Sequence, residues 1–177
     1  VGSDQLQHIE IARDIAQSFN HQYGDILQVP EASVQEENKL VQGLDGRKMS
    51  KSYNNHIPLF LKEKKLRKMI MKIKTDSLPP EAPKNPDDSV IYKLFEHFST
   101  KEEQAELRKA YAEGIGWGEA KQRLFEVINR ELAEPREKYE DLMASPEEIK
   151  RILALGAEKV RPRAQKILAQ VKKAIGV

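Results

Sequence analysis

Two lysines and two serines surround a methionine in the segment Lys48-Met49-Ser50-Lys51-Ser52. Lysine carries a mobile point charge, and a serine hydroxyl can donate a hydrogen bond to a phosphate oxygen. A loop with two such cations can close on a nucleotide and stabilise the negative charge that develops on a leaving pyrophosphate. The residue types also fit an ordinary basic surface turn, so both interpretations stay open at this point.

A second segment with possible chemistry, Gly2-Ser3-Asp4-Gln5, lies where we expect a strand to give way to a helix. Glycine lets a ligand approach the backbone, and the N-terminus of a helix offers N–H groups to an anion. The Asp4 carboxylate can accept hydrogen bonds from the vicinal hydroxyls of a ribose. Ser3 and Asp4 can equally act as caps of the helix, which is the commoner role of these residue types.

The distribution of charge favours contact with phosphate or nucleic acid. The 177 residues have a formal net charge of only +2. Residues 39–75, however, contain 11 basic and 2 acidic side chains, and residues 149–177 contain 8 and 1. Two basic blocks between acidic ones suit two phosphate-binding surfaces, although solvated helix faces have the same composition.

Several classes of site and location are excluded by composition. The chain has no cysteine, which excludes disulfides, thiolate zinc sites and cysteine nucleophiles and fits a reducing compartment. Its four histidines include no pair at ligand spacing, so we expect no histidine-built metal site. No apolar run approaches the roughly 20 residues that span a bilayer, and we expect neither a membrane span nor a secretory signal.

The residues that position these two segments predict an α/β region up to about residue 75. We expect a helix from Ser3 or Asp4 that ends at Gly24, short strands at 26–29 and 39–44, and a turn at Asp45-Gly46. Residues 47–55 are polar and predict a loop. Apolar spacing predicts a further helix over 62–74.

The rest of the chain predicts helices alone. Asp88 or Ser89 suits the cap of one helix, and Thr100 with Glu103 forms a capping-box pattern for the next. A long helix follows, Ser145-Pro146 predicts a new start, and Gly156 predicts a break before the last helix. Trp117 and the phenylalanines on apolar stripes are expected to pack rather than to react.

The fold class that we predict is therefore α/β followed by all-α. Residues 1–78 form the α/β part with the lysine loop, residues 79–86 are a Pro-rich linker, and residues 87–177 form a helical bundle.

Longer stretches around the two segments resemble a known family. Residues 43–52, Gly-Leu-Asp-Gly-Arg-Lys-Met-Ser-Lys-Ser, look like the lysine loop of class I aminoacyl-tRNA synthetases. Residues 1–8, Val-Gly-Ser-Asp-Gln-Leu-Gln-His, look like the Gly-x-Asp-Gln-x-Gln-His region of the bacterial tryptophanyl-tRNA synthetases. The likeness covers essentially the whole chain and corresponds to the C-terminal half of such an enzyme.

The resemblance implies the C-terminal part of a Rossmann-like catalytic domain, followed by helices for anticodon recognition and dimer support. It implies a cytoplasmic, homodimeric ligase that activates L-tryptophan with ATP and transfers it to tRNA(Trp). Magnesium would accompany ATP, with no metal held by the protein itself. The implied ATP-binding residues are Gly2, Ser3, Asp4, Leu40, Lys48, Met49, Ser50, Lys51 and Ser52.

Individual roles follow from the same resemblance. Gly2, Ser3 and Asp4 would contact the ribose side of ATP, and Gln5 would face tryptophan. Leu40 would pack near adenine, and Met49 would approach adenine through its backbone. Lys48 and Lys51 would be catalytic, because with the two serines they would hold the triphosphate and stabilise the leaving pyrophosphate.

The family also needs a His-x-Gly-His-type motif, and no histidine of this chain is followed by x-Gly-His or x-Gly-Asn. We therefore expect the 177 residues alone to be inactive or nearly so. Two alternatives stay open: a tyrosyl-tRNA synthetase fragment, and a non-catalytic RNA-binding module derived from a synthetase. The first is disfavoured because Leu6-Gln7-His8 follows Gln5, where tyrosyl enzymes usually continue with an aromatic residue and glycine.

Overall fold

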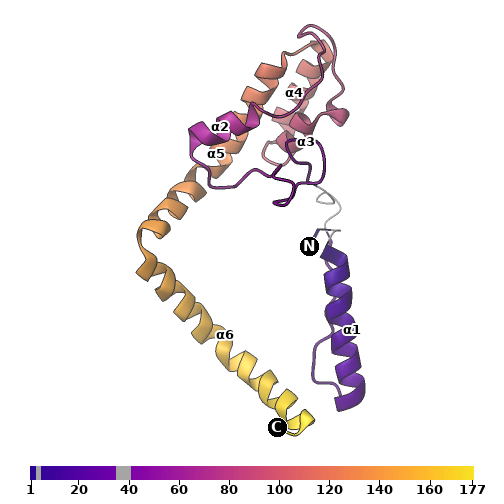
Figure 1. Ribbon diagram of the computed structural model, residues 1–177, viewed down its shortest axis with the longest axis vertical. Coiled ribbons are helices and arrows are strands. Elements are labelled where there is room, and N and C mark those ends of the chain that lie inside the picture. Colours follow the sequence, from indigo (N-terminus) through magenta and orange to yellow (C-terminus); the bar gives the residue numbers. More distant parts are fainter. Residues whose placement is uncertain (3–4, 35–40) are drawn as a thin grey trace. The chain divides into compact units, whose positions relative to one another are not determined.

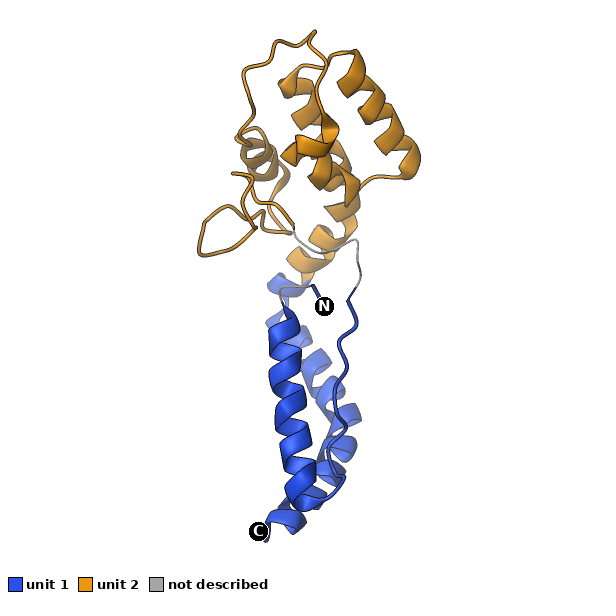
Figure 2. Cartoon of the chain, turned by 90° about the vertical axis from the view of Figure 1, so that its right-hand side faces the viewer, with its two compact units in different colours: residues 1–40, 142–177 blue, residues 41–141 orange. Residues whose placement is uncertain are grey.

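The computed structural model describes residues 1–2, 5–34 and 41–177, and this part of the chain is mostly helical (Figure 1). Its elements are α1 (Leu6–Tyr23), α2 (Glu63–Ile70), the 3-10 helix η3 (Pro86–Asp88), α3 (Val90–Glu96), α4 (Lys101–Glu113), α5 (Trp117–Ala144) and α6 (Pro146–Ile175). The chain divides into two compact units (Figure 2). Unit 1 consists of residues 1–40 and 142–177, and unit 2 consists of residues 41–141.

The predicted strand at 26–29 is wrong, because the segment adopts no strand conformation. The side chain of Asn20 holds it instead. Asn20 Oδ1 accepts hydrogen bonds from the backbone N–H groups of Ile26 (3.1 Å) and Leu27 (2.8 Å), and its Nδ2 donates to the Leu27 carbonyl (2.6 Å). These bonds occupy backbone groups that a neighbouring strand would need.

The second predicted strand, at 39–44, is reduced to a single antiparallel bridge between Gln42 and Lys48, with residues 39 and 40 outside the described part of the chain. The helical character predicted for the later residues is present. The α/β layer predicted for the earlier residues is not formed among the described residues.

Local capping patterns predicted three helix starts. Of the two candidates Asp88 and Ser89, it is Ser89 that caps α3, by accepting the N–H of Tyr92 (3.3 Å). Thr100 caps α4 by accepting the N–H of Glu103 (3.3 Å), and the Glu103 carboxylate accepts the N–H of Thr100 (2.8 Å), so the capping box is confirmed. Helix α6 begins at Pro146 as predicted, but the Ser145 side chain makes no capping hydrogen bond.

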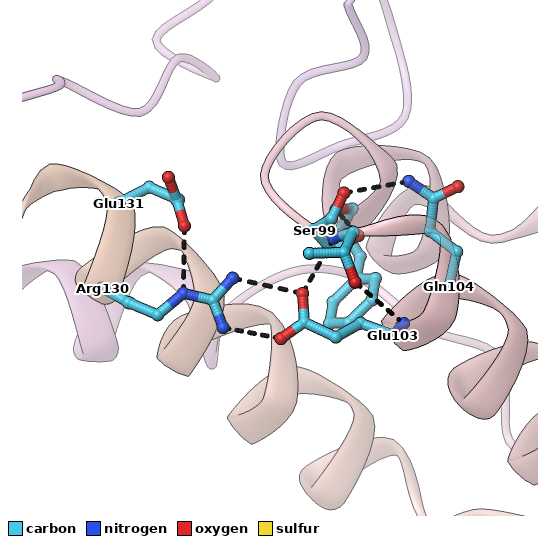
Figure 3. A network of polar contacts seen from close by, with 7 residues as sticks. Ser99, Glu103, Gln104, Arg130 and Glu131 are labelled. Atoms are coloured by element: carbon cyan, nitrogen blue, oxygen red, sulfur yellow. Dashed lines mark hydrogen bonds and ion pairs between the residues drawn. The ribbon is translucent and has the colours of Figure 1, made fainter.

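The capping box is tied to a second helix by an ion pair. Arg130 on α5 donates from Nη1 and Nη2 to the two carboxylate oxygens of Glu103 (2.6 and 3.1 Å), and from Nε to Glu131 (3.0 Å) (Figure 3). The Arg130 hydrogen bonds, followed by the Thr100 N–H, lower the pKa of Glu103 to about 2. The start of α4 is therefore held both locally and by α5.

Three other predicted helix boundaries can be compared with the structure. Helix α1 ends at Gly24 as predicted, and its N-cap is Gln5, whereas the proposed caps Ser3 and Asp4 lie outside the described residues. The predicted helix over 62–74 is shorter, spanning Glu63–Ile70. The predicted break at Gly156 is wrong because α6 runs through it, since an interior glycine costs a helix only about 1 kcal/mol.

Unit 2 contains a hydrophobic core. Most of its large, fully buried side chains come from α2, α3, α4 and α5, and one comes from the segment after α2; they are Leu66, Ile70, Ile73, Ile91, Leu107, Tyr111, Leu124 and Ile128. Tyr111 is fully buried, and its hydroxyl lies 3.0 Å from the Ser89 hydroxyl. Burial raises the pKa of Tyr111 to about 12, so this phenol stays neutral.

The Pro-rich segment 79–86 lies inside unit 2. Lys84 is only 5% exposed, and its Nζ donates to the carbonyl oxygens of Pro79 (2.8 Å), Pro80 (3.2 Å) and Ala82 (2.9 Å). The same ammonium lies 5.4 Å from the ring centroid of Trp117. The Lys84 ammonium thus holds the segment in place by binding three of its carbonyl oxygens.

The Pro-rich segment also packs closely against the end of α4. The backbone N–H of Lys84 donates to the Tyr111 carbonyl (2.8 Å). A Cβ atom on Gly114 would lie 2.6 Å from the Glu81 carbonyl oxygen, so only glycine fits there. The compact units divide at residues 40/41 and 141/142 and not at 79–86. The functional division into residues 1–78 and 87–177 stays a prediction.

Candidate functional site

Residues 45–55, which we call the cation loop, belong to unit 2 and begin at a hairpin-like turn. Around the Asp45-Gly46 turn, the N–H of Gly43 donates to the Arg47 carbonyl (2.8 Å) and the N–H of Met49 donates to the Val41 carbonyl (2.9 Å). These bonds flank the Gln42–Lys48 bridge. The predicted turn is confirmed, and the backbone leading to the lysines is paired.

Met49 anchors the cation loop to the core of unit 2. Its side chain is half-buried and packs against the buried cluster. It lines an almost entirely apolar pocket of about 190 Å³, together with Ile57 and with Leu94 and Phe98 from the α3 region. Lys48, the residue before Met49, is exposed. One apolar residue among polar ones therefore turns inward and leaves its lysine neighbour at the surface.

The second half of the cation loop is a tight turn. The N–H of Asn54 donates to the Lys51 carbonyl (3.0 Å), and Asn54 adopts a left-handed φ of 51°, which asparagine tolerates better than most residues. The Ser50 and Ser52 hydroxyls lie 2.7 Å apart, and the Ser52 N–H donates to Ser50 Oγ (3.3 Å). Both hydroxyls and the exposed Lys51 thus lie on one short turn.

Asn55 is a structural residue of the cation loop that the sequence did not single out. It is 3% exposed, and its Oδ1 accepts the Ser50 N–H (2.8 Å). Its Nδ2 donates to Asp45 Oδ1 (2.7 Å) and to the Lys48 carbonyl (3.0 Å). The available signal was its place at the end of the polar run 47–55, which does not reveal these partners.

Asp45 joins Asn55 to a surface cation. Its carboxylate accepts from the Arg47 backbone N–H (3.1 Å) and from Arg47 Nε (2.8 Å), and Arg47 Nη2 lies 2.7 Å from Asp45 Oδ2. The Asn55 hydrogen bond first, and then Arg47, lower the pKa of Asp45 to about 2. The Arg47 guanidinium lies 4.8 Å from the ring centroid of Tyr53. Both ends of the cation loop are therefore linked through Asp45.

The structure brings Lys48, Met49, Ser50, Lys51 and Ser52 together on one loop of unit 2. Of the other predicted site residues, Gly2 and Gln5 belong to unit 1, where the Gln5 N–H donates to the Gly2 carbonyl (2.9 Å). Ser3, Asp4 and Leu40 lie outside the described residues.

A basic surface follows the cation loop on α2. Leu66 and Ile70 are fully buried and fix the helix on the core. The exposed side carries a shallow hollow lined by Lys64, Arg67, Lys68, Met71 and Lys72. Arg67 Nε donates to Gln122 on α5 (3.1 Å), and Lys121 Nζ donates to the Met71 carbonyl (3.3 Å). The hollow thus gathers three lysines and one arginine, a set of charges that suits a polyanion.

Within the described ranges, no group of three or more histidine, aspartate or glutamate side chains is placed to hold a metal ion. No helix among the described residues has the length and apolar character that crossing a bilayer requires.

Comparison with known proteins gives consistent matches. The sequence profile of tRNA synthetases class I (W and Y) matches residues 1–133. The tryptophan–tRNA ligase of Neisseria meningitidis is 49% identical over 177 residues, which are 100% of this chain and 53% of that protein. The ligase of Pseudomonas aeruginosa is 47% identical over 180 residues, covering 100% of this chain and 40% of that protein.

A solved structure is similar along the whole chain. The crystal structure of tryptophanyl-tRNA synthetase from Campylobacter jejuni, complexed with ADP and tryptophan, matches with a TM-score of 0.86 and 44% sequence identity. The match covers 100% of this chain and 56% of that chain. The chain thus spans about half the length of these relatives.

Proposed function

The chain belongs to the class I tRNA synthetases of the tryptophan and tyrosine type, and from this premise we propose that it is the C-terminal portion of a tryptophan–tRNA ligase. Such an enzyme activates L-tryptophan with ATP to an aminoacyl-adenylate and transfers it to tRNA(Trp). The tryptophan branch is favoured over the tyrosine branch because the relatives at 49% and 47% identity are tryptophan–tRNA ligases. The part described as α/β from sequence would belong to a Rossmann-like catalytic domain.

The cation loop carries this proposal. Its backbone is held by the Gln42–Lys48 bridge, by the packing of Met49 against the core and by Asn55, while Lys48 and Lys51 are exposed. Cations held in a fixed place before the reaction stabilise developing charge without reorganisation. We assign Lys48, Ser50, Lys51 and Ser52 to the triphosphate and the leaving pyrophosphate.

The remaining assignments extend this binding site along ATP and tryptophan. Gly2, Ser3 and Asp4 would contact the ribose, Leu40 would pack near adenine, and Gln5 would face tryptophan. Met49 would approach adenine with its carbonyl oxygen, because its N–H is bound to Val41. Magnesium would arrive bound to the ATP phosphates, since lysines and serines suit phosphate oxygens rather than a metal ion.

The basic hollow on α2 supports tRNA as the partner, and helices after residue 86 would carry anticodon recognition. Replacing Lys64, Lys68 and Lys72 by glutamine should reduce the salt dependence of tRNA binding, with a slope smaller by about 2–3 in log–log units. The control variant K101Q/K109Q/K138Q removes the same charge from other exposed positions of unit 2. Equal losses in both variants would mean that tRNA responds to net charge and not to this hollow.

The catalytic proposal can be tested in a hybrid enzyme. The 177 residues would replace the matching region of the Neisseria meningitidis ligase, and tryptophan-dependent exchange of pyrophosphate into ATP would be measured. We expect an active hybrid, and K48Q/K51Q should slow exchange by about 10³-fold or more, because one electrostatic element contributes about 10²–10³. Exchange that is unchanged by K48Q/K51Q, or that depends on tyrosine, would contradict the proposal.

The isolated chain provides the complementary measurement. We expect it to catalyse no measurable exchange, since it spans about half the length of its relatives. Strong tRNA binding without any ATP-dependent activity in the hybrid would favour the non-catalytic RNA-binding module. On the same premise we expect the complete enzyme to be a cytoplasmic homodimer.

A further inference from the structure

Among the described residues, Asn55 is the most deeply buried side chain that carries an amide or a charge, with 3% of its surface exposed. An amide buried this deeply is costly unless its hydrogen bonds are made. Asn55 uses both Nδ2 hydrogens and Oδ1. Its partners also determine its orientation, because the Asp45 carboxylate and the Lys48 carbonyl accept only, whereas the Ser50 N–H donates only.

The three partners of Asn55 lie at the points that determine the direction of the cation loop. Asp45 begins the loop, and Lys48 and Ser50 lie on either side of Met49. The amide therefore fixes the backbone at Lys48 and Ser50, from which the Lys48 side chain and the Lys51 turn project. Asn55 itself is buried, so it acts through these residues and not on a ligand.

The space around Asn55 is matched to an asparagine. A Cβ atom on Gly43 would lie 2.4 Å from Asn55 Cγ, so the backbone at Gly43 presses directly on the amide. The N–H of Leu44 also donates to the Asn55 carbonyl (2.9 Å), which joins the end of the cation loop to the residue just before its start. A longer side chain would not fit, and a carboxylate would face the Asp45 carboxylate and the Lys48 carbonyl.

We infer that Asn55 is a positioning residue for phosphate binding: its buried amide joins Asp45, Lys48 and Ser50 and so holds the two lysines of the cation loop in their binding arrangement. The inference rests on the proposed function, because it assigns phosphate to Lys48 and Lys51. The inference adds Asn55 to the site as a residue that does not contact phosphate itself but determines how tightly Lys48 and Lys51 bind it.

The test uses the 177-residue chain and inorganic tripolyphosphate, with binding measured by calorimetry. In N55D the introduced carboxylate keeps the acceptor for the Ser50 N–H, loses both donors and faces Asp45. We expect affinity to fall at least tenfold. The matched control N85D introduces the same charge at an exposed position of unit 2 and should stay within twofold of the original chain. The folded fraction of each variant would be checked by the fluorescence of the single tryptophan, Trp117.

A swap separates positioning from simple destabilisation. In N55D two carboxylates, at positions 45 and 55, face each other. The double variant D45N/N55D replaces the one at position 45 by an amide, and should recover at least half of the affinity lost in N55D on a logarithmic scale. A loss caused only by disturbed packing would not be recovered. If N55D does not fold, D45N/N55D takes its place: an affinity that is reduced, but by less than tenfold, supports the inference, and an affinity equal to that of the original chain contradicts it.

The outcomes also separate this inference from the proposed function. If the chain binds tripolyphosphate, K48Q/K51Q abolishes binding and N55D binds like the original chain, the role of Asn55 is refuted and the phosphate site stands. If K48Q/K51Q binds like the original chain, or the original chain does not bind, the phosphate assignment fails and the role of Asn55 fails with it.

Discussion

Unit 1 and unit 2 both contain long amphipathic helices, yet only unit 2 buries their apolar faces. Among the described residues, fifteen of the sixteen buried hydrophobic side chains lie in unit 2, and the other is Ala16 in α1. Helix α6 spans 30 residues and has none that is buried. Its Leu153, Val160 and Leu168 are 67%, 62% and 52% exposed. An apolar stripe therefore identifies one face of a helix and does not say that this chain covers it.

The largest expected difference between the units comes from removing one leucine from each. Leu124→Ala on α5 deletes a fully buried side chain and should lower the free energy of unfolding by about 2–5 kcal/mol. Leu168→Ala on α6 should change it by less than about 1 kcal/mol, because a half-exposed side chain leaves no closed cavity. Urea denaturation followed by Trp117 fluorescence reports on unit 2, and far-ultraviolet circular dichroism reports on both units. Comparable losses would show that α6 is packed in solution.

Buried charge provides a second contrast. Lys84→Met removes an ammonium that satisfies three carbonyl oxygens and should destabilise unit 2 by about 1–3 kcal/mol. Lys159→Met on α6 is an exposed counterpart and should stay within about 0.5 kcal/mol. Thermal unfolding followed by Trp117 fluorescence checks the first variant, since the tryptophan ring lies beside Lys84. A stable K84M protein would mean that water satisfies the carbonyls equally well.

Substitutions at helix caps should give a smaller difference in stability, again with the larger loss in unit 2. Thr100→Ala removes a capping hydrogen bond at the start of α4 and should cost about 1 kcal/mol. Ser145→Ala at the start of α6 should be nearly neutral, because its side chain makes no such bond. Both values come from urea denaturation monitored by circular dichroism. An equal cost at the two sites would show that Ser145 caps α6 in solution.

The smallest effect is a dependence on pH in unit 2. The pKa of Glu103 is lowered from 4.5 to about 2, so the ionised form is favoured by folding. Its contribution to stability is complete above about pH 4.5 and disappears as the pH falls towards 2. E103Q should therefore flatten the fall in melting temperature between pH 5 and pH 3. E148Q on α6 should flatten it less, because Glu148 pairs with Arg151 of the same exposed helix. If the melting temperature of E103Q falls with pH as steeply as that of the original chain, the acid sensitivity belongs to other groups such as Asp45, whose pKa is also lowered to about 2.

Part of the geometry around the candidate site could be predicted from sequence. The Asp45-Gly46 turn is confirmed, whereas the phosphate chemistry indicated by the residue string from Lys48 to Ser52 stays a prediction. The partners of Asn55 could not be predicted, because they depend on how the loop lies over Met49 and against Gly43. The ligand-binding roles of all the predicted site residues stay predictions, and Ser3, Asp4 and Leu40 also lie outside the described residues.

In the fold, as in the candidate site, contacts between residues close in sequence could be predicted and contacts between distant residues could not. The caps at Ser89 and Thr100 were readable because each hydrogen bond joins residues three apart. The Pro-rich segment was interpreted as a linker because prolines interrupt helices. Sequence alone did not show that the Lys84 ammonium donates hydrogen bonds to the carbonyl oxygens of this segment. The strand expected at 26–29 was lost to the side chain of Asn20, six and seven residues away.

By itself, the sequence determined where most helices start, the polar turn and the basic blocks, since these follow from contacts within a few residues or from composition. The tertiary structure alone decided which apolar faces are buried, which lysine is enclosed and which amide orients the cation loop. The physical reason is that burial and buried hydrogen bonds require partners from distant parts of the chain, and local spacing does not specify those partners.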